Sequence, residues 1–224
     1  QIECRVARHQ TLRYTHPMYN SEHITTIRNW LGTGAINIFG LPFSGKDSQG
    51  RRLASILGGS LVGGGQILRG SVIPPHVQAD LDAGILVPTD DYMRIVIPYL
   101  SRQEFADKPL LLSAVGRWHG EEDGVVQALQ ASQHPLRAVI SLTISEDEAR
   151  RRWMEHENQK DRGERSDDSE TVLENRFHEF HTKTEPVLAY YRERQLLIEV
   201  DGTLSRDDVT NEAILKLAQF AAAH

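Results

Sequence analysis

The sequence predicts an α/β fold with three layers, in which a parallel β-sheet lies between two layers of helices. Short apolar segments typical of buried strands recur along the chain, and each is followed by a helical pattern. This alternation favours a parallel sheet covered on both faces. A glycine-rich turn joins the first segment to its helix, as in a phosphate-binding loop. The predicted strands are Ala35–Phe39, Leu110–Ser113, Ala138–Leu142 and Leu196–Val200.

The composition is that of a soluble globular protein. The chain has 224 residues, of which 39% are hydrophobic and 25% charged, which suits one α/β domain with small appended lobes. No apolar run approaches the ~20 residues of a membrane helix. A net charge of −6 argues against sequence-independent binding to nucleic acid. One cysteine, Cys4, excludes an internal disulfide framework and favours a cytoplasmic location. We expect a monomer, because no long exposed apolar stripe is evident.

The segment before the first strand is predicted to be an N-terminal extension, residues 1–34. It is mixed in character, rich in histidine and without a clear period. We expect a short helix at His23–Leu31 and no chemistry in this segment.

Later helices are marked by their ends and their apolar faces. A capping box, Ser145-Glu-Asp-Glu148, opens one of them. Ser169–Arg192 is predicted to be a long helix that Pro186 interrupts or kinks. Ser205–Ala222 is predicted to be a final amphipathic helix.

The glycine-rich turn has the spacing of a phosphate-binding loop (P-loop), Gly40-x4-Gly45-Lys46. Glycines let the backbone wrap closely around phosphate oxygens, so that successive N–H groups point inward at a helix N-terminus. Lys46 adds a mobile charge for the β- and γ-phosphates. The next position is usually Ser or Thr, whose hydroxyl reaches Mg²⁺; here it is Asp47, and Ser48 follows. The alternative is a glycine-rich turn with an incidental lysine.

The loop resembles that of the adenylate kinase family, which reads Gly-x-Pro-Gly-Ser-Gly-Lys-Gly-Thr-Gln. The chain matches this pattern at Gly40, Pro42, Ser44, Gly45, Lys46 and Gln49. Phe43 and Asp47 replace two glycines, and Ser48 replaces the threonine. Further similar segments follow in the family's order: Gly65–Arg69, Gly84–Pro88, Leu112–Arg117, Arg165–Asp168, Thr184–Tyr191 and Val200–Gly202.

The resemblance implies a nucleoside monophosphate kinase, with ATP as donor, Mg²⁺ as cofactor and AMP as the default acceptor. The kinase domain would span residues 35–224, with an acceptor-binding lobe at about 60–100 and a lid at about 154–168. Only about ten residues separate His156 from Asp167, so the lid would be the short kind. A zinc-bearing lid needs four ligands that a single cysteine does not supply.

Phosphoryl transfer needs positioning and charge neutralisation more than a base or a nucleophile, and a closed lid that keeps water out. The resemblance assigns catalysis to Lys46, Arg117, Arg152, Arg165 and Arg176. It assigns ATP binding to Gly40, Ser44, Gly45, Lys46, Asp47 and Ser48. It assigns acceptor binding to Gly64, Arg69, Leu86, Val87, Arg117 and Glu121. In the lid, Asp167 would pair with arginines and Asp168 follows it; the alternative is that both only cap a helix.

Any single arginine is more often a surface residue than a catalytic one. We expect four of them to form a solvated face or helix ion pairs. These are Arg150, Arg151, Arg162 and Arg192.

The chain departs from the family pattern at several positions of the predicted site. Ser113 replaces an Asp that organises Mg²⁺, and Glu121 replaces a Gln that reads adenine. Gly64 replaces a Ser or Thr near the acceptor base, beside Gln66 in place of an Asp, and His156 replaces a second lid Arg.

Two of these departures lead to hypotheses. A carboxylate at Asp47 would ligate Mg²⁺, with Ser48 beside it, and offset the loss at Ser113; alternatively Asp47 only caps the helix. An ionised Glu121 would favour a base with two donors, such as guanine, because it only accepts hydrogen bonds. Alternatively Glu121 faces solvent and reads no base.

Two other functions remain open at this point. The missing Asp at position 113 and the altered lid suit a nucleotide-binding protein with weakened catalysis. A small P-loop kinase with a different acceptor is the second alternative.

Overall fold

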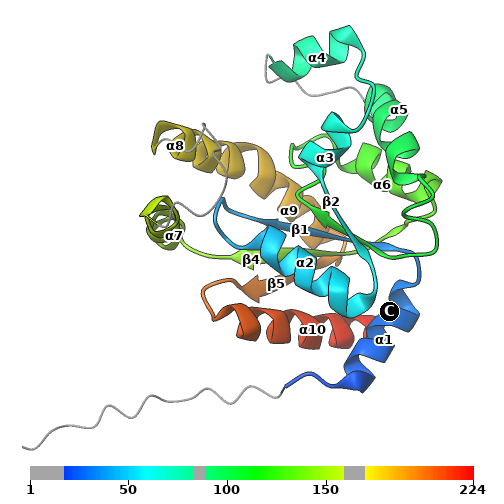
Figure 1. Ribbon diagram of the computed structural model, residues 1–224, viewed down its shortest axis with the longest axis vertical. Coiled ribbons are helices and arrows are strands. Elements are labelled where there is room, and N and C mark those ends of the chain that lie inside the picture. Colours follow the sequence, from blue (N-terminus) through cyan, green and yellow to red (C-terminus); the bar gives the residue numbers. More distant parts are fainter. Residues whose placement is uncertain (1–17, 83–88, 159–169) are drawn as a thin grey trace, which may run out of the picture.

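The computed structural model describes residues 18–82, 89–158 and 170–224. Within these residues, five parallel strands form one sheet in the order β2-β3-β1-β4-β5 (Figure 1). The strands are β1 (Ala35–Gly40), β2 (Ser60–Gly63), β3 (Leu110–Ser113), β4 (Leu136–Thr143) and β5 (Leu197–Asp201). The predicted α/β fold with a parallel sheet is confirmed.

The edge strand β2 is the strand that the sequence pattern does not predict. It has only four residues, and its two apolar side chains lie between a Ser and a Gly. Its register pairs Gly63 with Ser113 of β3. The start of the predicted acceptor lobe therefore lies beside the end of a central strand.

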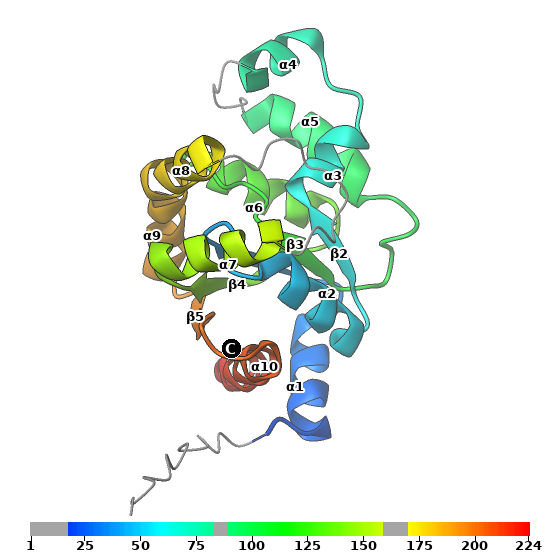
Figure 2. The same cartoon turned by 60° about the vertical axis from the view of Figure 1, so that its left-hand side comes forward.

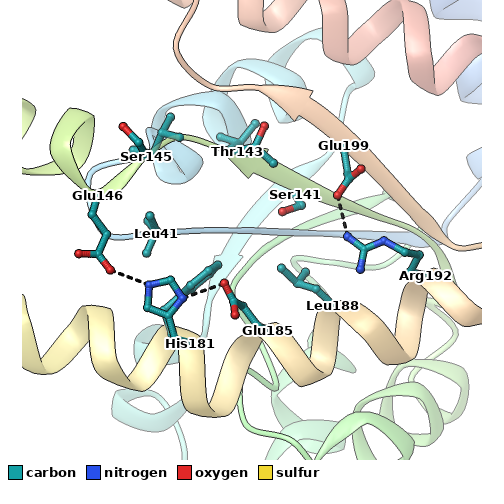
Figure 3. Close-up of a pocket in the computed structure, with 13 residues that line it drawn as sticks. Leu41, Ser141, Thr143, Ser145, Glu146, His181, Glu185, Leu188, Arg192 and Glu199 are labelled. Carbon is teal, nitrogen blue, oxygen red and sulfur yellow. Dashed lines mark hydrogen bonds and ion pairs between the residues drawn. The ribbon is translucent and has the colours of Figure 1, made fainter.

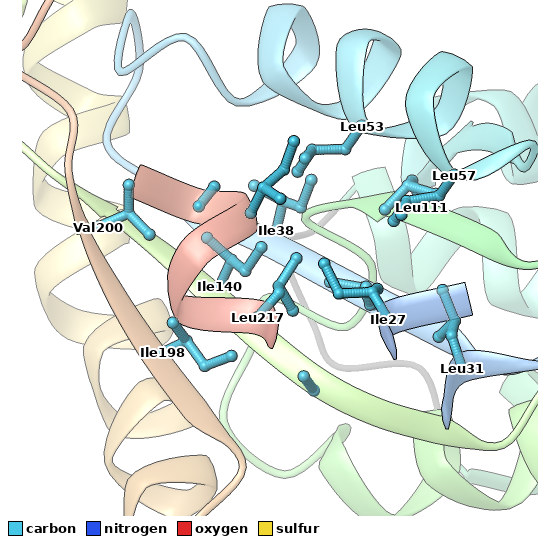
Figure 4. Packing of buried hydrophobic residues seen from close by; sticks show 14 of the residues in the cluster. Ile27, Leu31, Ile38, Leu53, Leu57, Leu111, Ile140, Ile198, Val200 and Leu217 are labelled. Carbon is cyan, nitrogen blue, oxygen red and sulfur yellow. The ribbon is translucent and has the colours of Figure 1, made fainter. Parts of the chain in front are cut away.

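One face of the sheet is covered by α1 (Ser21–Leu31), α2 (Lys46–Leu57) and α10 (Arg206–Ala223). Alternate strand residues point toward these helices, as the two-residue period of a strand requires. Ile38 of β1, Leu111 of β3 and Ile140 of β4 belong to this cluster (Figure 4).

The opposite face is covered by α5 (Thr89–Leu100), α6 (Glu122–Ala131) and α9 (Glu185–Glu193). Leu110 and Leu112, the neighbours of Leu111 on β3, pack with α5 and α6. Phe39 of β1 and Val139 of β4 pack with α9. Both faces are therefore covered, and the strands are rich in apolar residues, as is usual for parallel sheets.

Helix α1 belongs to the same core. It begins at Ser21 rather than at the predicted His23, because the Asn20 side chain accepts hydrogen bonds from the N–H groups of its first turn. Ile27 and Leu31 are fully buried against the sheet. The helix therefore seals one face of the sheet.

A small lobe of three helices projects from one end of the core (Figures 1 and 2). It consists of α3 (Gly64–Arg69), α4 (Pro75–Asp82) and α5, and it lies where the sequence predicts the acceptor lobe. On another side, α7 (Glu146–Asn158) and α8 (Glu170–Glu179) lie beside each other and flank the predicted lid. Residues 159–169 lie outside the described part of the chain.

The predicted long helix is interrupted by a π-helical turn. Helix α8 runs into η1 (Phe180–Thr184), and α9 continues from there. Pro186 has no N–H to donate, so the regular α-helical hydrogen bonds cannot pass through this point. The predicted interruption is confirmed, and its form is a local widening of the helix just before the proline.

The cap of α7 is only half of the predicted capping box. The Glu148 N–H donates to Ser145 Oγ at 3.2 Å. The Glu148 side chain instead accepts hydrogen bonds from Arg151 and Arg152. In the described part of the chain, no helix combines the length and the apolar character needed to cross a membrane.

Candidate active site

The phosphate loop connects the end of β1 to the start of α2 (Figure 1). The chain turns sharply here, and the Ser44 N–H donates to the Leu41 carbonyl at 3.1 Å. A Cβ at Gly40 would lie 2.5 Å from Ser44 Oγ and 2.8 Å from the Leu142 carbonyl oxygen. Gly45, with φ of 92°, has a backbone conformation that favours glycine. The two motif glycines are therefore required by the path of the loop.

Phe43 also lies in the left-handed region, with φ of 61°. Such a conformation costs a residue with a side chain about 1–2 kcal/mol. The ring packs against an apolar cluster between the loop, α7 and α8. The cluster consists of Leu41, Ala149, Leu173 and Phe177, with Ile144, Trp153 and Phe180 at its margin. Contact with this cluster offsets the strain and joins the loop to α7 and α8.

Ser44 contributes a buried hydroxyl to the loop. Among the described residues, Ser44 Oγ and Tyr191 Oη are the buried side-chain oxygens without a hydrogen-bond partner. Leaving a buried polar group unsatisfied costs about 1–3 kcal/mol. The Ser44 hydroxyl is therefore a hydrogen-bond donor in the loop that is available to a bound ligand. Lys46 follows as the first residue of α2 and is half-buried.

Asp47 and Ser113 lie in contact at the carboxyl edge of the sheet. The Ser113 hydroxyl donates to Asp47 Oδ1. Asp47 lies in the first turn of α2 and is exposed, whereas Ser113 is buried at the end of β3. Ser113 uses only one of the two carboxylate oxygens. One oxygen of the Asp47 carboxylate therefore lies within hydrogen-bond distance of the side chain at position 113.

Arg152 joins the phosphate loop to two other parts of the core. Its guanidinium donates to Glu148 Oε1 at 2.6 Å and to the Gly202 carbonyl at 2.7 Å. Its Nη1 lies 3.5 Å from the Ser44 carbonyl oxygen. The side chain is only 23% exposed, so these contacts fix one cation between the loop and the turn after β5.

Arg117 follows β3 in a segment, residues 114–121, that is held from several sides. Ala114 and Gly116 both have positive φ, 49° and 65°. Asn37, a buried residue of β1, donates to the Val115 carbonyl at 2.7 Å and accepts from the Val115 N–H at 3.3 Å. The Arg117 side chain is half-exposed and pairs with Glu179 of α8 at 3.6 Å.

Glu121 closes the same segment. Its Oε2 accepts from the Trp118 N–H at 3.2 Å, and the side chain is half-buried. Burial raises the pKa of this carboxyl above its ordinary value, against the lowering effect of the Trp118 hydrogen bond and of Arg117. One carboxylate oxygen therefore stabilises the turn, which limits what the group offers to a base.

The remaining predicted site residues are only partly described. Arg176 lies on α8 and is half-buried. Gly64 opens α3, and a Cβ there would lie 3.5 Å from the Ala114 carbonyl oxygen. Arg69 and His156 belong to α3 and α7, but their side chains are outside the description. Five predicted residues lie outside the described ranges: Leu86, Val87, Arg165, Asp167 and Asp168.

The arginines expected on the surface form ion pairs, as predicted. Arg150 pairs with Glu146 at 3.1 Å and binds Glu174 at 2.9 Å. Arg151 pairs with Glu148 at 2.7 Å. Arg192 pairs with Glu199 at 2.7 Å, and Arg162 lies outside the described residues.

A cavity of about 440 Å³ lies on the α9 side of β4 and β5 (Figure 3). His181 of η1 bridges two carboxylates in it, with Nε2 at 2.7 Å from Glu146 and Nδ1 at 2.8 Å from Glu185. These two bonds, that to Glu185 foremost, raise the pKa of His181. The charged side chains that line the cavity are paired with each other. The described lining of the cavity contains none of the predicted site residues. The cavity borders the phosphate loop through Leu41 alone among its described lining residues.

Two residues that position the site were not predicted. Asn37 carries a weak signal, since it is a polar residue inside the apolar run Ala35-Ile-Asn-Ile-Phe39. Thr184, buried in η1, donates to the Arg117 carbonyl at 2.9 Å. Nothing in its local sequence indicates a partner 67 residues away.

A parallel sheet with a phosphate loop between β1 and α2, and with the Arg152 guanidinium held beside that loop, is typical of a P-loop kinase. Such an enzyme transfers a phosphoryl group from a nucleoside triphosphate. Curated proteins narrow this class. The chain is 32% identical over 191 residues to an adenylate kinase of Pseudarthrobacter chlorophenolicus, an alignment that covers 82% of this chain and 97% of the relative. It is 33% identical over 186 residues to an adenylate kinase of Clavibacter michiganensis, covering 81% and 91%. The chain belongs to the adenylate kinase family.

Comparison with solved structures supports the fold. A gluconokinase from Sinorhizobium meliloti superposes with a TM-score of 0.53 and 20% sequence identity, covering 85% of this chain and 95% of the gluconokinase. At this identity the likeness concerns the fold alone. No protein-family model matches the chain.

Proposed function

We propose that this P-loop phosphotransferase is a nucleoside monophosphate kinase, which transfers the γ-phosphoryl group of ATP to a nucleoside monophosphate in a Mg²⁺-dependent reaction. The contact between Ser113 and Asp47 carries the proposal. The loss of the family's Asp at position 113 is the main argument for a protein that binds nucleotides without catalysis. A carboxylate from α2 in contact with Ser113 supports catalysis instead.

The donor phosphates would bind at the N-terminus of α2. Backbone N–H groups of the loop and the helix dipole favour anions there. The Ser44 hydroxyl, buried without a partner, would donate to a phosphate oxygen. Lys46 would neutralise the β- and γ-phosphates, and Gly40 and Gly45 allow the close approach of the backbone.

The residues around the loop fit a magnesium ion. Mg²⁺ prefers oxygen ligands and is usually held by one or two carboxylates together with substrate phosphates and water. Asp47 and Ser48 would hold it, and Ser113 would orient the Asp47 carboxylate. Bound there, Mg²⁺ would supply charge neutralisation for the phosphate groups during phosphoryl transfer. In the described ranges, no group of three or more His, Cys, Asp or Glu residues forms a metal-binding cluster.

The remaining cations would surround the transferred group. Arg152 is already fixed beside the loop through Ser44 and Gly202. Arg117 would leave Glu179 for a phosphate oxygen, since a guanidinium binds phosphate in a bidentate manner. Arg165 and Arg176 would join them when the lid closes and water is excluded. Asp167 and Asp168 would hold the closed lid through its arginines.

The acceptor would bind against the small helical lobe. Arg69 would hold its phosphate, and Gly64, Leu86 and Val87 would line its base. AMP is the default acceptor, because the relatives named above are adenylate kinases. Glu121 would choose between bases through the carboxylate oxygen that Trp118 does not use.

The enzyme would work as a monomer in the cytoplasm, where both of its substrates are found. Its partners would be ATP and a monophosphate rather than nucleic acid or membrane. A net charge of −6 disfavours the electrostatic attraction that nucleic acid requires.

A coupled assay of ADP release tests the proposal. ATP and Mg²⁺ are supplied with AMP, CMP, UMP, GMP or dTMP in turn, and Lys46→Ala is the control. Turnover with one acceptor, lost in the control, supports the proposal and identifies the substrate. ATP binding without turnover for any acceptor would instead indicate a degenerate nucleotide-binding protein. Equal rates with all five acceptors would remove Glu121 as a selector.

A further inference from the structure

The π-helical turn η1 is one of the supports of the segment that carries Arg117. Three contacts join them. Thr184 Oγ1 donates to the Arg117 carbonyl at 2.9 Å. The His119 N–H donates to the Lys183 carbonyl at 3.0 Å. The Lys183 ammonium lies 4.0 Å from the centre of the Trp118 ring, within the range of a cation–π contact. One face of one helical turn therefore holds three consecutive residues of the segment.

The turn offers both a backbone and a side-chain partner to the segment that carries Arg117. The Lys183 carbonyl accepts a hydrogen bond from the His119 N–H. Thr184 is buried, so its hydroxyl needs a partner and finds one in the Arg117 carbonyl.

The Arg117 side chain is held by the same helix. Glu179, the last residue of α8, pairs with Arg117 at 3.6 Å and accepts from Lys183 at 3.4 Å. The backbone and the side chain of Arg117 are thus both held by the stretch that joins the lid helix α8 to the core helix α9.

We infer that Thr184 is a positioning residue for Arg117: its hydroxyl, set by the π-helical turn, fixes the backbone from which the arginine reaches the transferring phosphate. The inference rests on the proposed function of Arg117 in phosphoryl transfer. Small errors in the placement of a catalytic group lower the rate strongly, up to about a hundredfold for 1 Å. Thr184 should therefore affect turnover without touching a substrate.

Thr184→Val tests this inference, because valine keeps the shape of threonine and removes the hydroxyl. We expect kcat to fall roughly tenfold or more, with the KM for ATP unchanged. Thr184→Ser, which keeps the hydroxyl, should restore the parent's kcat. Thr182→Val is the matched control: Thr182 lies in the same turn, and its hydroxyl bonds only the His178 carbonyl, at 2.7 Å, on an exposed face. The control should keep the parent's kcat.

A double-mutant cycle separates positioning from general destabilisation. In an Arg117→Ala background, Thr184→Val should lower kcat no further, while its effect on the melting temperature stays the same. An equal fold-loss of kcat in both backgrounds overturns the inference, as does parental turnover in Thr184→Val. If Arg117→Ala alone keeps parental turnover, Arg117 is not catalytic and the inference falls with that role.

Hydrogen exchange gives a readout that does not depend on activity. The amides of residues 117–121 should exchange faster in Thr184→Val than in Thr182→Val or the parent, because the support by η1 is lost. Unchanged exchange overturns the inference. If the parent turns over no monophosphate, the proposed function fails, and exchange still decides whether Thr184 holds the segment.

Discussion

The hydroxyl of Ser113 donates a hydrogen bond to the carboxylate of Asp47, and this contact joins the end of β3 to the first turn of α2. The two residues are 66 positions apart in the chain. The family resemblance places an Asp at position 113, where this chain has Ser113 in contact with Asp47. We expect this carboxylate to act as a metal ligand rather than only as a charge at the helix N-terminus.

Asp47→Asn should raise the Mg²⁺ requirement of the enzyme. The variant keeps an oxygen that accepts from Ser113 but loses the charge. We expect the Mg²⁺ concentration for half-maximal activity to rise roughly tenfold or more, as for the loss of a residue that binds or orients a metal. Titration of activity with Mg²⁺ at saturating ATP measures it.

A double variant that moves the carboxylate from position 47 to position 113 provides the matching control. Asp47→Asn combined with Ser113→Asp returns the charge to the position it has in the family, and the Mg²⁺ requirement should return toward that of the parent. If the Mg²⁺ titrations of parent and Asp47→Asn coincide, the carboxylate is no ligand and acts only on the helix dipole.

At position 43, a glycine variant should be more stable than an alanine variant, which reverses their usual order of stability. At an ordinary helical site glycine is less stable than alanine by about 0.5–1 kcal/mol. At Phe43, with φ of 61°, we expect Phe43→Gly to be more stable than Phe43→Ala by about 1 kcal/mol, because only glycine avoids the strain. Urea unfolding of the two variants measures the difference.

Gln127 supplies the comparison for this prediction. It is exposed within α6, so Gln127→Ala should be more stable than Gln127→Gly. If alanine is also the better residue at position 43, the loop does not hold Phe43 in the left-handed conformation.

Arg152 should matter far more than its neighbour Arg151. Arg152→Ala removes contacts to Glu148 and to the carbonyls of Ser44 and Gly202. We expect kcat/KM for ATP to fall roughly tenfold to a hundredfold through misplacement of the loop. Arg152→Lys should recover only part of this, because an ammonium lacks the planar fork.

Arg151→Ala is the control for the role of Arg152. Its side chain is 54% exposed and pairs only with glutamates of its own helix, so we expect stability and kinetics within about 0.5 kcal/mol of the parent. If both variants lower the melting temperature but leave the KM for ATP unchanged, Arg152 holds the fold and not the nucleotide.

The parts of the site that the sequence predicts are those encoded in a continuous stretch. The phosphate loop follows from the spacing of Gly40, Gly45 and Lys46, and the buried strands follow from short apolar runs. Strand β2 escapes prediction because four residues carry too little pattern. The π-turn escapes because Pro186 indicates that a helix is disturbed but not how.

The parts of the site that the sequence does not predict depend on contacts between residues that are far apart in the chain. The replacement of one carboxylate by another is suggested by the sequence, but the bond that joins Asp47 to Ser113 depends on the order of the strands. The same holds for Asn37 with Val115 and for Thr184 with Arg117, which are 78 and 67 positions apart. Their side chains meet only because the sheet and the helix before α9 bring them together.

His181 should make stability depend on pH through its two carboxylates (Figure 3). Hydrogen bonds to Glu185 and Glu146 raise its pKa above 6.5. The bond from His181, aided by Arg150, lowers the pKa of Glu146 below 4.5. A group whose pKa is raised by folding stabilises the protein fully at pH values below its pKa in the unfolded chain. This stabilisation is lost as the pH rises through its pKa in the folded protein. The Glu146 contribution is present above pH 4.5 and is lost as the pH falls.

The stabilisation by His181 should therefore be full near pH 6 and decline toward pH 9. His181→Gln removes the charge, so the difference in the free energy of unfolding between parent and variant should shrink over this range. We expect a change on the order of 0.5 kcal/mol, because the His181 side chain is 41% exposed. Urea unfolding at several pH values measures it, with His178→Gln on the exposed face of α8 as the control. A parent–variant difference that stays constant from pH 6 to pH 9 would show that the three side chains do not form a charged bridge.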